Sequence, residues 1–94
     1  MNNLHIKIIR NDELFLFTNL GDEAIMMNTS NGVFMELNRI AVDIWMFLQE
    51  PISVENLIKK LTDKYEVDES VCKNETVVYL QKMLKEKMLH KLAD

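Results

Sequence analysis

Apolar and polar residues alternate through the first third of the chain, in short segments separated by turn signals. A Gly-Asp pair separates the first two segments, and an Asn-Gly pair precedes the last. Asn-Gly supplies the positive φ angles that tight hairpins need. The pattern therefore predicts an antiparallel meander of three strands, over residues 14–20, 23–28 and 33–37. The isoleucines of segment 6–9 can add an extra strand before it.

Helical periodicity replaces the alternation after the third predicted strand. Asn38 is a favourable N-cap residue, and Pro51 ends the first helix because the residue before a proline is driven out of the α region. Ser53 caps a second helix. The apolar face of the first helix is Ala41, Ile44, Trp45 and Leu48, with Trp45 in the core. That of the second is Val54, Leu57, Ile58, Leu61 and Tyr65.

A third helix is predicted over about 70–88, with Asp68 or Ser70 as its cap. No glycine marks its end. Residues at spacings of three and four along this helix are expected to face the core: Val77, Leu80, Leu84 and Met88.

Strands followed by helices are typical of the α+β class. The N-terminal three-stranded antiparallel meander, followed by three helices with a tight connection between the last two, favours a winged helix-turn-helix. A chain of 94 residues accommodates one domain. We expect residues 1–12 to be an N-terminal extension and residues 13–94 to be the single winged-helix domain.

The composition excludes several kinds of chemistry. One cysteine, Cys72, allows neither an internal disulfide nor a multi-cysteine metal site. The two histidines lie near opposite ends, and no phosphate-binding or nucleophile motif occurs. No apolar run approaches the roughly 20 residues of a membrane span. We therefore expect a cytoplasmic binding module that is not an enzyme, with no catalytic residues, no metal, no cofactor and no membrane partner.

Several motifs in combination resemble the PqqD-like family. They are Leu37-Asn38, Ile44-Trp45 and Val54-Glu55-Asn56-Leu57, within a resemblance that covers about residues 13–90. A glycine common near the end of the family's third helix is here Met88. The resemblance implies a free-standing recognition element for ribosomally synthesised, post-translationally modified peptides, as in lasso-peptide, sactipeptide or pyrroloquinoline quinone pathways. It implies that a precursor's leader segment binds as an added strand, and that a modifying enzyme or leader protease receives it.

The third strand of the meander is an edge strand, whose free backbone groups can pair with an incoming chain. The family places the leader against this edge and the third helix. The predicted peptide-binding residues are Val33, Phe34, Met35 and Glu36 on the strand and Val78, Lys82 and Met83 on the helix. Cys72, Tyr79 and Gln81 can line the same cleft. The lysines of segment 73–91 can attract an acidic leader, or form a solvated face.

The alternative is a winged-helix DNA-binding transcriptional regulator whose recognition helix spans about 70–88. A formal net charge of −4 and the lack of arginine on that helix weigh against it. We therefore expect no nucleic-acid partner. An open strand edge can also pair with itself, so we expect a monomer or a weak, strand-swapped dimer.

Overall fold

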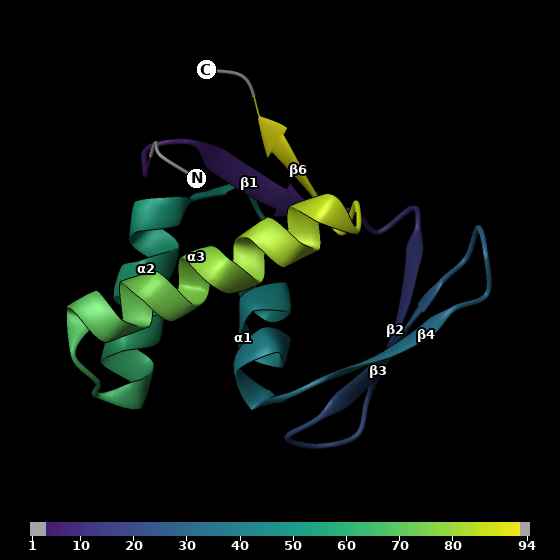
Figure 1. The fold of residues 1–94 in the computed structure, drawn as a ribbon, viewed down its shortest axis with the longest axis horizontal. Helices are drawn as coiled ribbons and strands as arrows, with labels where there is room; N and C mark the ends of the chain where they lie inside the picture. Colours follow the sequence, from purple (N-terminus) through teal and green to yellow (C-terminus); the bar gives the residue numbers. More distant parts are fainter. Residues whose placement is uncertain (1–3, 93–94) are drawn as a thin grey trace.

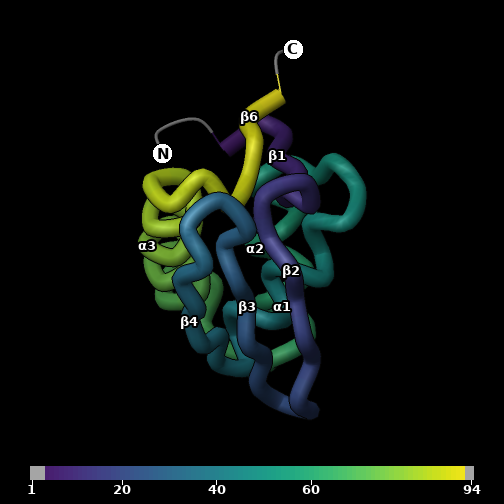
Figure 2. The backbone as a smooth tube through the Cα atoms, turned by 90° about the vertical axis from the view of Figure 1, so that its right-hand side faces the viewer, coloured from purple at the N-terminus to yellow at the C-terminus, as the bar shows by residue number. Residues whose placement is uncertain are grey.

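Two small antiparallel sheets and three helices make up residues 4–92, the part of the chain that the computed structural model describes (Figure 1). In chain order the elements are β1 (Lys7–Arg10), β2 (Phe15–Asn19), β3 (Ala24–Asn28), β4 (Phe34–Leu37), α1 (Arg39–Phe47), β5 (Ile52–Ser53), α2 (Val54–Tyr65), α3 (Glu69–Lys85) and β6 (Leu89–Leu92). The helices lie on one side of the sheet that β2, β3 and β4 form (Figures 1 and 2).

The first sheet is the predicted meander, with strand order β2-β3-β4. Phe17 pairs with Met26, and Met26 pairs with Met35, so these side chains form one row across the sheet. The α+β class, the meander and the three helices are thereby confirmed. The winged helix-turn-helix arrangement stays a prediction.

The second sheet, in the order β5-β1-β6, joins the two ends of the described chain. Its central strand, β1, is the extra strand that the isoleucines indicate, and it pairs with β5 and β6 instead of the meander. Ile8 lies opposite Ile52 on one side and Lys91 on the other. Neither β5 nor β6 is predicted from the sequence, since β5 has only two residues and β6 follows directly on a helical pattern.

Trp45 is the centre of the core, as predicted, and joins α1 to the meander. Its ring meets Phe15 edge-on and Phe17 in a stacked arrangement, with both ring centroids 6.3 Å away. The guanidinium of Arg10 lies 5.2 Å from the Trp45 ring centroid. Burial of this aromatic group fixes the sheet against the helices.

Each helix begins at a predicted cap. The side chain of Asn38 accepts a hydrogen bond from the amide of Ala41, and that of Ser53 accepts one from Asn56. The carboxylate of Asp68 accepts bonds from Ser70, and these lower its pKa from the usual 3.8. The local sequence therefore sets all three helix starts among the described residues.

The third helix ends earlier than predicted, at Lys85 instead of about 88. Lys87 adopts a left-handed conformation with φ of 61°. Its N–H donates to the carbonyl of Leu84 (3.1 Å), and the N–H of Met88 donates to that of Met83 (2.8 Å). This pair of bonds is a Schellman motif, which usually has glycine at the left-handed position. A lysine there ends the helix without any glycine signal.

The buried face of α3 also differs from the prediction. Leu80 is buried as expected, but Val77 and Leu84 are only half-buried, and Met88 is buried beyond the end of the helix. Thr76 takes the buried position that the pattern assigned to Val77, because Thr76 lies on one helical stripe with the buried Cys72, Leu80 and Met83. Oγ1 of Thr76 and Sγ of Cys72 are 3.8 Å apart.

Asp43 connects α1 to the end of α2. Its carboxylate accepts hydrogen bonds from Lys64, at 2.8 Å, and from the hydroxyl of Tyr65. Burial raises the pKa of Asp43, but these two bonds outweigh burial and bring the pKa below 3.8. Burial and the bond to Asp43 raise the pKa of Tyr65 to about 12. The contact thus favours the charged form of Asp43 and the neutral form of Tyr65.

Candidate functional site

The outer edge of β4 is one of the two unpaired edges of the meander, and the other belongs to β2. β3 pairs with β4 on one side, and no strand among residues 4–92 pairs with it on the other. The C-terminal strand β6 is occupied with β1 in the other sheet. The edge predicted from the sequence to be open is therefore open.

The hydrogen-bond pattern between β3 and β4 identifies which backbone groups face this edge. The N–H of Asn28 donates to the carbonyl of Val33 at 2.9 Å, so Val33 directs its polar groups at β3. Orientation alternates along an antiparallel strand. Met35 therefore also faces β3, while the N–H and C=O groups of Phe34 and Glu36 face the open edge.

A groove of about 740 Å³ runs between β4 and α3. The side chains and backbone around it come from the end of β4, the start of α1 and the second half of α3: Glu23, Met35, Glu36, Leu37, Asn38, Ala41, Tyr79, Lys82, Met83, Lys85, Glu86 and Met88. Its inner surface is apolar and belongs to the core, since Met83 is only 3% exposed and Leu37, Ala41 and Met88 are also buried. An extended chain placed along β4 would thus have an apolar surface beside it.

One hydrogen bond spans this groove. The amide Nδ2 of Asn38 donates to the hydroxyl of Tyr79 at 2.5 Å, while Oδ1 of the same side chain caps α1 through Ala41. Asn38 directly follows β4, and Tyr79 lies on α3. The side chain therefore fixes the distance between the edge strand and the helix at one end of the groove.

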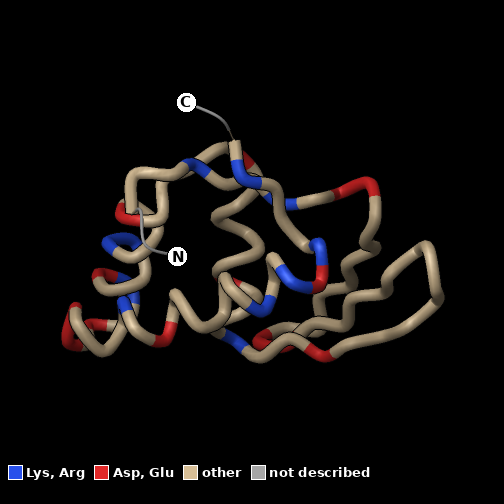
Figure 3. The backbone as a smooth tube through the Cα atoms, turned by 45° about the horizontal axis from the view of Figure 1, so that its top comes forward, with Lys and Arg blue, Asp and Glu red and all other residues tan. Residues whose placement is uncertain are grey.

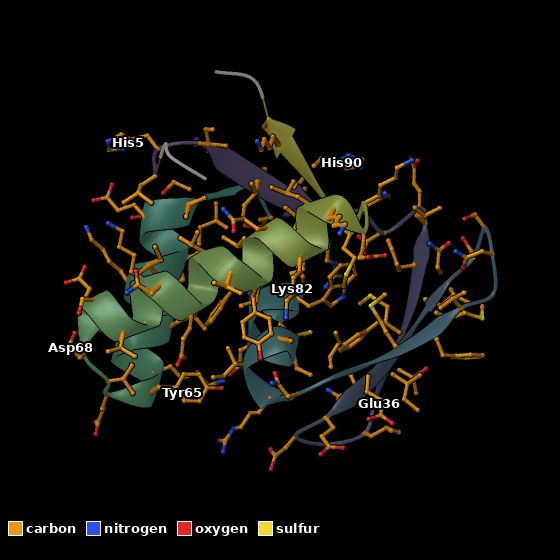
Figure 4. All side chains as sticks on the ribbon, in the orientation of Figure 1. His5, Glu36, Tyr65, Asp68, Lys82 and His90 are labelled. Atoms are coloured by element: carbon orange, nitrogen blue, oxygen red, sulfur yellow. The ribbon has the colours of Figure 1, made fainter. Side chains whose placement is uncertain are left out.

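Both walls of the groove carry charged residues. Glu23 and Glu36 lie on the sheet side, whereas Lys82, Lys85 and Glu86 lie on the α3 side. Figure 4 shows Lys82 extending from α3 toward the side of the molecule where β4 lies. Within residues 4–92, no ion pair involves either lysine. Both cations thus remain accessible to a ligand.

The predicted contact residues fall into two groups. Met35, Glu36, Lys82 and Met83 line the groove together. Val33 and Phe34 lie before it along the edge, and Phe34 instead lines a smaller cavity of about 270 Å³ with Ile25 on the outer face. Val78 lies on α3 outside the groove and is 51% exposed. Peptide contact at all seven positions stays a prediction.

Several groove residues were not among the predicted contacts, above all Asn38, Lys85 and Met88. The helical stripe that contains Tyr79, Lys82, Met83 and Glu86 could be found from its spacing of three and four, once Leu80 is assigned to the core. Met88 could not, because it reaches the groove only after the helix has ended at the Schellman motif.

Other candidate chemistry is limited. Cys72 is a buried residue of α3 that faces α2, with Sγ 3.8 Å from the carbonyl oxygen of Ile58, and it does not line the groove. In the described part of the chain, no group of three His, Cys, Asp or Glu side chains could hold a metal ion. Nor does any described helix have the length and apolar character needed to cross a membrane.

Comparison with known proteins assigns the chain to a family and its fold to a known class. Residues 23–89 match the family model of coenzyme PQQ synthesis protein D (PqqD), so the chain belongs to the PqqD family. No curated protein sequence matches it significantly. Among solved structures it is similar to one described as TbiB1 in complex with the TbiA(beta) leader peptide. The TM-score is 0.78 at 20% identity, covering 92% of this chain and 99% of that one.

Proposed function

We propose that this chain is a binding module that captures the leader segment of a ribosomally synthesised precursor peptide. The leader is added as a strand to the open edge of β4, next to α3, and is presented to a modifying enzyme or leader protease. The observation that carries the proposal is the unpaired β4 edge beside an apolar groove. The proposal requires neither catalysis nor a cofactor, and it places the chain in the cytoplasm, where ribosomes make precursors.

The geometry supports both affinity and selectivity. The backbone groups of Phe34 and Glu36 can form strand hydrogen bonds, each of which contributes about 1 kcal/mol net. Side chains of the added strand alternate in direction, so every second one is directed at the groove surface formed by Met35 and Met83. Burial of one large apolar side chain there contributes about 1.5–3 kcal/mol. Lys82 can pair with an acidic side chain of the peptide.

The comparisons support the same proposal. Membership of the PqqD family associates the chain with peptide-derived cofactor biosynthesis, and the similar TbiB1 structure contains a leader peptide. We extend leader binding to this chain because the β4 edge is available here and the groove beside it is lined by residues from β4 and α3.

Two proline substitutions on adjacent residues test the proposal. Glu36→Pro removes an N–H that faces the open edge, so the fold should survive, since edge strands tolerate proline at such positions. Met35→Pro removes an N–H that bonds to β3, and it should destabilise the fold by roughly 3 kcal/mol. Fluorescence anisotropy with the labelled leader of the precursor encoded beside this chain's gene should show at least about tenfold weaker binding to Glu36→Pro.

Glu36→Gln is the matched control, because it removes the charge and keeps the N–H. It should bind the leader within about threefold of the unmodified chain, since an exposed charge contributes little. Circular dichroism shows whether each variant is folded. A folded Glu36→Pro variant that binds the leader as tightly as the unmodified chain would contradict strand addition. Binding of random duplex DNA, steeply dependent on salt, with no leader binding would favour the DNA-binding alternative instead.

A further inference from the structure

The outer face of the meander is apolar and uncovered. Two rows of paired residues cross it: Leu16, Met27 and Phe34 form one, and Thr18, Ile25 and Glu36 form the other. Leu16 is 57% exposed and Phe34 is 67% exposed, although both are large and apolar. Figure 2 shows β2, β3 and β4 in front of the helices, with no described element on the viewer's side of them. Contiguous exposed apolar surface of this kind marks an interaction site.

The charge of the same region is of one sign. Between Arg10 and Arg39 the sequence contains no lysine or arginine. The charged residues of this stretch are Asp12, Glu13, Asp22, Glu23 and Glu36. Asp12 pairs with Arg10, Oδ1 to Nε at 2.7 Å, so the uncompensated charges are those of the four others. Figure 3 accordingly shows red and no blue on the meander, mostly in the connections before and between its strands. The net negative charge of the chain is therefore concentrated around the apolar face.

We propose that this outer face, with Leu16 and Phe34 at its centre, docks a partner protein through an apolar patch bordered by lysine and arginine. Charge complementarity selects this occupant. A second copy of the chain would bring two acidic meanders together, and like charges oppose such an interface. Nucleic acids and anionic membranes are repelled for the same reason.

The outer face lies next to the proposed leader site, and this position indicates the kind of partner. This inference rests on the proposed function. A leader strand on β4 would extend the meander by one strand, and its outward side chains would continue the row that ends at Phe34. A protein docked on the face would thus contact the bound leader directly. The partner is therefore the enzyme that processes the leader-bearing precursor.

Leu16→Ser tests the docking face without altering the groove, because β2 is separated from the open edge by two strands. The matched control is Val71→Ser, on α3, whose side chain is 51% exposed and lies outside the meander. The probe is the purified processing enzyme encoded beside the precursor, with the chain loaded with leader. Surface plasmon resonance should show at least about fivefold weaker docking for Leu16→Ser and a change under about twofold for Val71→Ser.

A charge variant adds a second readout. Asp22→Asn removes one negative charge beside the face, outside the residues that line the groove. It should lower the association rate and flatten its dependence on salt, and it should leave the dissociation rate nearly unchanged. Equal docking by Leu16→Ser and the unmodified chain, or a leucine-dependent dimer of the chain in sedimentation, would overturn the docking face.

The leader titration of the preceding subsection is repeated on each variant. If Leu16→Ser binds the leader and docks the enzyme as tightly as the unmodified chain does, the docking face is disproved and the proposed function is left intact. Absence of leader binding to the unmodified chain disproves the proposed function, whatever the enzyme does. A benzoylphenylalanine at position 16 that crosslinks to the enzyme, while one at position 71 does not, supports the docking face independently of leader affinity.

Discussion

The two sheets of this molecule treat their edges differently. In the β5-β1-β6 sheet, both neighbours of the central strand come from the chain itself, and Ile8 at its centre is 0% exposed. The edges of that sheet are unattractive for pairing, since β5 has two residues after a proline and β6 carries Lys91. In the β2-β3-β4 sheet, β4 has neither proline nor lysine, and the groove lies alongside it.

The difference shows how a short chain can keep one strand edge vacant. The segment after α3 pairs with β1 over four residues instead of extending the meander. The N-terminal strand is likewise held between β5 and β6. Both ends of the described chain are thus paired within the β5-β1-β6 sheet, and the outer edge of β4 is left unpaired.

The largest expected effect is on the free energy of unfolding, from a substitution in the β5-β1-β6 sheet. Ile8→Ala should lower the free energy of unfolding by about 2–5 kcal/mol, because it leaves a cavity in a fully buried position. Phe34→Ala removes a larger side chain from the meander. It should change the free energy of unfolding by less than about 0.5 kcal/mol, since Phe34 is exposed. Urea unfolding measures both. A similar loss of unfolding free energy from both substitutions would show that the side chain of Phe34 is packed as tightly as that of Ile8.

A smaller effect is expected at the hydrogen bond that spans the groove. Tyr79→Phe removes the hydroxyl and should weaken leader binding by about fivefold, corresponding to about 1 kcal/mol, while leaving α1 capped by Asn38. Asn38→Asp preserves both contacts, because a carboxylate can cap the helix and accept the tyrosine hydroxyl. The Tyr79→Phe effect on dissociation rate should therefore not be reproduced by Asn38→Asp.

A urea unfolding measurement on Tyr79→Phe shows whether the Asn38–Tyr79 hydrogen bond shapes the groove or stabilises the fold. Tyr79→Phe should shift the urea midpoint only slightly, since the bonded groups lie at an exposed site. A large loss of stability with an unchanged dissociation rate would mean that the bond supports the fold instead of the groove.

The smallest expected effect is on the free energy of unfolding, from the turn at Lys87 that connects α3 to β6. Lys87→Gly should raise the free energy of unfolding by about 0.5–1 kcal/mol, because glycine adopts the left-handed conformation without the steric cost that lysine pays. Glu66→Gly, at a second left-handed position with φ of 51°, should behave alike. Lys73→Gly, inside α3, should instead lower it by about 1 kcal/mol. Thermal unfolding followed by circular dichroism distinguishes these signs.

Much of the fold could be predicted because local signals and tertiary packing agree. The Asn-Gly turn, the caps at Asn38, Ser53 and Asp68, and the apolar face around Trp45 each act over a few residues. That β4 is an edge strand of the meander also follows from strand order alone. These features need no knowledge of distant contacts.

The remainder depends on contacts that the sequence pattern does not reveal. β5 and β6 exist because β1 lies between them, and neither has a strand-like pattern of its own. The end of α3 depends on a lysine in an unusual conformation, and its buried face is the stripe that includes the polar Thr76 and Cys72, which an apolar pattern does not pick out. The groove wall beyond Lys85 could not be predicted for that reason.

Three of the side chains along the groove are thioethers: Met35, Met83 and Met88. Methionine is unbranched and polarizable, so it can change rotamer to suit leucine, isoleucine or phenylalanine without moving the backbone. Mutational drift in a cognate peptide would therefore be absorbed by rearrangement of these side chains. A receptor built in this way can keep its ligand while the ligand's sequence changes over evolutionary time.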